Sequence, residues 1–154
     1  MDSDRHPSKH RILVIANETV ESGILRDTIR SSVEELSTAE VLVVAPALNS
    51  RVRHWVSDED EARSAAENRL SRSVDRLARA GLDANGWVGD ADPLLAIADA
   101  LHVFAADKLI IATHPDRRSN WLARNLVIRA RRRFHLPILH IVVDASCSSE
   151  YVAA

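Results

Sequence analysis

The sequence predicts an α/β domain in which helices cover both faces of a five-stranded, mostly parallel sheet. Short apolar runs alternate with longer segments in which apolar residues recur every three or four positions, the pattern of strands followed by amphipathic helices. Strands joined through helices pair in parallel by right-handed crossovers. The strand runs are apolar without alternation, which is typical of strands buried on both faces. The 154 residues suffice for one such domain.

Five short apolar runs supply the predicted strands, and the third of them is the weakest. In chain order they are 11–16, 40–45, 84–88, 108–113 and 137–143.

Four segments with helical periodicity supply the predicted helices. They are 22–36, 58–80, a third segment beginning at residue 93, and 121–133. Gly81 suits the position just beyond the C-terminus of the second helix. Asp92 as N-cap, with Pro93 at the first helical position, is a start signal for the third helix.

The composition excludes several classes of protein. The net charge of −2 counts against a nucleic-acid-binding protein, and we expect the arginines at 129–133 to be a solvated helix face. The single cysteine, Cys147, excludes an internal disulfide framework and a cysteine-based metal cluster. No apolar run approaches a membrane span, and the polar start 1–10 lacks the core of a signal peptide. We therefore expect a cytoplasmic domain at 11–143, with a flexible lead before it and a tail at 144–154.

Polar residues follow the predicted strands at the edge where open α/β sheets bind ligands. The strand 108–113 runs into a polar loop at 114–120, and this loop opens a helix whose free N–H groups favour an anion. The candidate ligand-binding residues at this edge are Asn17, Glu18, Thr19, Ala45, Asp90, Thr113, His114, Arg117, Arg118, Ser119, Asn120 and Arg124.

Several of these candidates also have a plainer interpretation. Ser119 or Asn120 can cap the fourth helix, and the arginines beside them can be solvated; caps are common and anion sites are not. His114 has no catalytic partner at a recognisable spacing, so we expect it to line the crevice. Asp92 is explained as a cap, which weakens a paired-carboxylate site with Asp90. The sequence thus predicts no catalytic residue and no metal site.

Three stretches together resemble the universal stress protein family. They are ILVIANET, the first strand with the polar cluster that ends it, WVGDADPLLAIADAL at the entry to the third helix, and ADKLIIATHPD at the end of the fourth strand. The resemblance covers roughly 11–143. It implies the strand order 3-2-1-4-5, with an adenine nucleotide, where one is bound, across the ends of strands one and four. It also implies a homodimer formed through the last strand, here His140, Ile141, Val142 and Val143.

The sequence departs from the pattern of family members that bind ATP. Asn17 stands where those members carry an aspartate. The signature G-x2-G-x9-G-S/T falls on Ala112, Pro115, Asn125 and Leu126. Proline has no N–H and fixes φ, so a phosphate cradle of backbone amides is not expected. The resemblance therefore leaves ATP or AMP as a ligand open, and no cofactor is predicted firmly.

Three functions remain open from the sequence. The first is a universal stress protein-like sensor in the stress response that binds a small molecule, an adenine nucleotide or another anion, without turnover. The second is a homodimeric scaffold that acts through protein partners. The third is a nucleotide hydrolase, which we rank last because a fold does not carry a function by itself.

Overall fold

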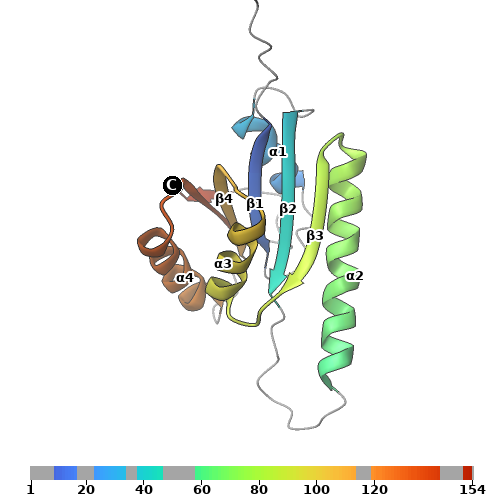
Figure 1. The fold of residues 1–154 in the computed structure, drawn as a ribbon, viewed down its shortest axis with the longest axis vertical. Helices are drawn as coiled ribbons and strands as arrows, with labels where there is room; N and C mark the ends of the chain where they lie inside the picture. The colour runs from blue at the N-terminus through green and yellow to red at the C-terminus, as the bar shows by residue number, and fades with distance from the viewer. Residues whose placement is uncertain are drawn as a thin grey trace, which may run out of the picture.

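A computed structural model describes residues 9–16, 23–33, 38–46, 58–113, 119–142 and 151–153. The strands are β1 (His10–Ala16), β2 (Ala39–Pro46), β3 (Asp83–Gly89), β4 (Lys108–Thr113), β5 (Ile138–Val142) and β6 (Tyr151–Ala153). The helices are α1 (Gly23–Ser32), α2 (Asp58–Arg79), α3 (Pro93–Val103) and α4 (Ser119–Arg133). The strands form one sheet in the order β3-β2-β1-β4-β5-β6 (Figure 1).

The predicted parallel sheet is confirmed, with one correction. Strands β1 to β5 pair in parallel in the predicted order, with helices between them. The sheet has six strands rather than five, because β6 pairs antiparallel with β5. The tail at 144–154 therefore contains a strand that the sequence analysis missed. Three residues are too few to show a periodicity, although Tyr and Val favour strands.

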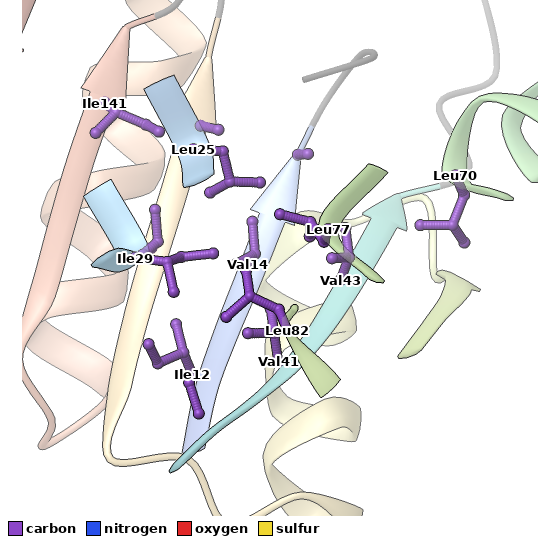
Figure 2. Close-up of a cluster of buried hydrophobic side chains, with 14 residues drawn as sticks. Ile12, Val14, Leu25, Ile29, Val41, Val43, Leu70, Leu77, Leu82 and Ile141 are labelled. Carbon is purple, nitrogen blue, oxygen red and sulfur yellow. The ribbon is translucent and has the colours of Figure 1, made fainter. Parts of the chain in front are cut away.

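The two faces of the sheet bury separate clusters of apolar side chains. Along β1, Ile12 and Val14 face α1 and α2, whereas Leu13 and Ile15 face α3 and α4, as the alternation of a strand requires. Figure 2 shows the first cluster, in which side chains from β1 and β2 meet those of α1 and α2. Helix α2 runs alongside β3 at one end of the sheet (Figure 1). Burial on both faces explains the unbroken apolar runs of the central strands.

The ends of α2 and α3 follow the predicted signals. Gly81 has φ of 90°, and its N–H donates to the carbonyl of Ala78 at 3.0 Å. The N–H of Leu82 donates to the carbonyl of Leu77 at 3.1 Å, which completes a Schellman motif. Asp92 is the N-cap of α3, and its carboxylate accepts from the N–H of Leu94 at 2.9 Å. The C-terminus of α2 and the N-terminus of α3 therefore lie where the sequence predicts them.

A polar cluster around Arg11 links the strands at the amino edge of the sheet, where their amino ends lie. The N–H of Arg11 donates to Asp107 Oδ2 at 2.9 Å, and the N–H of Asp107 donates back to the carbonyl of Arg11 at 2.8 Å. Arg11 Nε donates to Glu40 Oε2 at 3.2 Å, and the guanidinium carbon lies 5.2 Å from the centre of the Phe104 ring. These contacts join β1 to β2 and to the connection before β4. They lie at the edge opposite the predicted ligand site.

The termini of most elements differ from the predicted ones by one or two residues. Helix α4 begins at Ser119 instead of residue 121, and β5 ends at Val142 instead of residue 143. In the part of the chain that the structure describes, no helix combines the length and the apolar composition needed to cross a bilayer.

Candidate functional site

The topology places a switch point between β1 and β4. From β1 the chain crosses to β2 on one side, and β4 lies on the other side of β1. The two strands run in parallel, and Ala16 at the end of β1 is level with Ala112 of β4. Because their outgoing connections diverge, the carboxyl ends of these two strands form the position where open α/β sheets bind ligands.

Most of the predicted site residues lie outside the described part of the chain. Six of them fall between the described ranges: Asn17, Glu18, Thr19, His114, Arg117 and Arg118. Three belong to the first turns of α4, but their side chains are outside the described residues: Ser119, Asn120 and Arg124. The structure therefore places only Ala45, Asp90 and Thr113 of the predicted set.

These three residues do not lie together. The side chain of Ala45, in β2, is partly buried against the cluster that faces α1 and α2. Asp90 follows β3, and its carboxylate accepts from the N–H of Asp92 at 2.8 Å, so it shapes the turn into α3. Three strand spacings separate β3 from β4, about 14 Å at the usual strand distance. Of the three, only Thr113 lies at the switch point.

Thr113 is the last residue of β4, and its hydroxyl contacts a histidine of the next strand. It is 7% exposed, and its Oγ1 lies 2.9 Å from Nε2 of His140. His140 lies in β5, level with Ile111. Burial, and secondarily the positive charge of Arg131, lowers the pKa of the His140 imidazole below its usual value of 6.5. Both effects favour the neutral form of the imidazole.

The family resemblance implies for His140 only a place in a dimer-forming strand. A usable signal was present, because His140 is the one residue with a polar side chain in the apolar run 137–143. Thr113 is two residues beyond the inward-facing Ile111 and so shares its face of the sheet. A polar residue at that face of the neighbouring strand is a natural partner for a buried hydroxyl.

The positions of the glycine signature do not form a phosphate cradle in the described residues. Ala112 is 3% exposed within β4, where a glycine would be required. Asn125 and Leu126 lie inside α4 rather than at its first turn. Leu126 packs against the cluster that faces α3 and α4, so its side chain is part of the core. Close approach of a phosphate to backbone at these positions is not supported.

Comparison with solved structures identifies the fold. A universal stress protein family protein from Arabidopsis thaliana with AMP bound matches with a TM-score of 0.54 and 13% sequence identity, covering 89% of this chain and 94% of that one. A universal stress protein in complex with cAMP matches with a TM-score of 0.56 and 17% identity, covering 86% of this chain and 97% of that one. The chain has the universal stress protein fold. No family model matches the sequence, and no curated protein is significantly similar to it.

The universal stress protein fold accounts for the strand order and for the switch point between β1 and β4. The family resemblance of the three sequence stretches is thus confirmed at the level of the fold. At identities this low, the likeness carries the architecture and not the individual site residues. The universal stress protein fold leaves β5 with an outer edge, which in this chain pairs with β6 over His140–Val142.

Proposed function

We propose that the protein is a universal stress protein-like sensor that binds an adenine nucleotide at the carboxyl ends of β1 and β4. The observation that carries this proposal is the switch point, where β1 and β4 end side by side. It is supported by two structures of the same fold whose ligands are AMP and cAMP. The ligand class is therefore a nucleotide with an anionic phosphate.

Binding without turnover suits the described residues better than catalysis does. Thr113 and His140 form a hydroxyl–imidazole pair, which is one part of a nucleophilic site. A hydrolytic triad also needs a group that orients the second ring nitrogen. Among the described residues no such group bonds Nδ1 of His140. The pair is thus poorly placed to attack a substrate.

The altered signature positions imply modest affinity for a phosphate. Glycines let a phosphate come close to backbone N–H groups, which then bind it strongly. In this chain Ala112 and Leu126 stand at two of the glycine-signature positions. We therefore expect weak ATP binding, with the phosphate held by side chains.

The test is a titration of 15N-labelled protein with AMP and with cAMP, followed by backbone amide shifts. Adenosine serves as the matched ligand without a phosphate. We expect shifts near Ala16 and Thr113 at the carboxyl edge. The amides of Arg11 and Asp107 provide an internal control, since they lie at the amino edge. The proposal would be contradicted if AMP and cAMP both left the amide shifts unchanged at the carboxyl edge and at the amino edge.

A scaffold that acts through protein partners is the second candidate. It is favoured by the core packing of Leu126, which removes a ligand-binding position from the signature. A homodimer through β5 belongs to this proposal. Because β6 occupies the outer edge of His140–Val142, pairing of two copies at that edge requires β6 to move away.

A further inference from the structure

The hydrogen bond between Thr113 and His140 has two possible directions. A threonine hydroxyl has one proton to donate and lone pairs that accept. If Nε2 carries no proton, Thr113 donates its only proton to the imidazole and can offer a ligand only lone pairs. If Nε2 carries a proton, His140 donates to Thr113, and the hydroxyl proton is free to point elsewhere.

This choice matters because of where Thr113 lies. It ends β4 at the switch point, so among the described residues its hydroxyl is a group that a ligand at this edge can meet. An anionic phosphate oxygen accepts hydrogen bonds and does not donate them. A Thr113 hydroxyl that only accepts is therefore mismatched to a phosphate, whereas one that can donate is matched to it.

We propose that His140 is a positioning residue for the site: the neutral imidazole carries its proton on Nδ1 and accepts from Thr113, whereas protonation adds a proton on Nε2, frees the Thr113 hydroxyl to donate to a ligand and so strengthens the binding of an anion. This inference rests on the proposed nucleotide-binding function. It adds a proton-linked control of that function through a residue that does not itself contact the ligand.

The surroundings of His140 support a neutral imidazole that can still take up a proton. The strand registers place Ile111 of β4 and Ala153 of β6 level with His140, and neither side chain titrates. Among the described side chains of α4, Arg131 carries the charge that acts on His140, and it disfavours the imidazolium together with burial. Helix α3 makes its main contacts with β1, β2 and β3 rather than with β5. His140 is only half-buried, so protons can reach it.

The experiment compares the affinities of cAMP and adenosine by titration calorimetry from about pH 7.5 to about pH 5. The phosphodiester of cAMP keeps its charge over this range, whereas the phosphate of AMP titrates within it. We expect the affinity for cAMP to rise about two- to tenfold on acidification, the range that one hydrogen bond gives. Adenosine should show no such rise.

Three variants separate the proposed effect from a simple attraction between charges. Thr113→Ser keeps the hydroxyl and should keep the rise with cAMP. Thr113→Val removes the hydroxyl at nearly the same shape, and His140→Gln removes the titrating group. In each of these two variants the affinity for cAMP should not change with pH. Circular dichroism and a cooperative urea transition check that each variant is folded.

The possible outcomes are distinct. A rise that persists in Thr113→Val would show that the imidazolium attracts the anion directly and would overturn the role of Thr113. Binding of cAMP by the wild-type protein that does not change with pH would overturn the inference but leave the proposed function intact. Failure of both ligands to bind at every pH would overturn the proposed function and the inference with it.

Discussion

Replacing Gly89 by alanine should destabilise the protein through the contact between β3 and α3. A Cβ atom built on Gly89 would lie 2.8 Å from Cγ1 of Val44 and 2.9 Å from Cβ of Ala96. Both neighbours belong to the buried cluster that faces α3 and α4. Val44 is 0% exposed in a central strand, and Ala96 is held in a helix, so neither can move aside easily. Helix α3 approaches β3 this closely only because residue 89 has no side chain.

The expected size of the effect follows from two opposing terms. Overpacking of a filled core costs about 1–3 kcal/mol. Replacing glycine by alanine also restricts the unfolded chain, which stabilises by about 0.4–1 kcal/mol. We expect a net loss of about 1–2 kcal/mol in the free energy of unfolding. For a domain of this size the melting temperature should fall by about 2–8 °C.

Urea unfolding followed by circular dichroism measures this loss, and Gly23→Ala provides the matched control. At Gly23 an added Cβ would meet Arg26 and Asp27 at 3.8 and 3.9 Å, which are ordinary contacts. The control should therefore unfold at the wild-type urea concentration or slightly above it. Gly89→Ala with wild-type stability and an unchanged dependence on urea would refute the close packing of α3 on β3.

Three further predictions concern the cap, the histidine and the last strand. Asp92→Ala should lower the free energy of unfolding by about 1 kcal/mol, because the N–H of Leu94 loses its acceptor, and Asp92→Asn should restore most of it; equal losses in both variants would contradict the capping role. The lowered pKa of His140 means that the unfolded chain binds its proton more readily, so stability should decrease as pH falls below 6.5 towards the folded-state pKa. His140→Gln should lack this component, and an identical pH dependence in both proteins would rule it out. Deleting residues 144–154 uncovers the edge of β5, so sedimentation should show more dimer than for the full chain, whereas an unchanged monomer fraction would argue against pairing there.

The fold was predictable because its signals are local and redundant. The runs at β1, β2 and β4 are apolar apart from their end residues, and Gly81 and Asp92 mark helix ends through backbone requirements that few residues meet. Strand β6 was not predictable from the sequence. Its three residues pair through backbone hydrogen bonds, and a segment this short shows no hydrophobic pattern.

The position of the candidate site could be predicted from the sequence, but the hydrogen-bond partner of Thr113 could not. The carboxyl edge follows from topology, and Thr113 was identified as part of it. The pairing of Thr113 with His140 joins residues 27 apart in the chain, so it depends on the register between β4 and β5. Asp90 and Thr113 both lie at the carboxyl ends of strands, which is all that the sequence shows of their positions. The strand order places them at opposite sides of β1, where no single small ligand need touch both.

The central claim is that a nucleotide binds where β1 and β4 end. A crystal structure of the protein grown with cAMP tests this most directly. We expect electron density for the nucleotide beside Ala16 and Thr113, with a phosphate oxygen within hydrogen-bond distance of the Thr113 hydroxyl in crystals grown at acidic pH. Density for cAMP at the amino edge near Arg11, or none at the switch point in crystals saturated with the nucleotide, would contradict it.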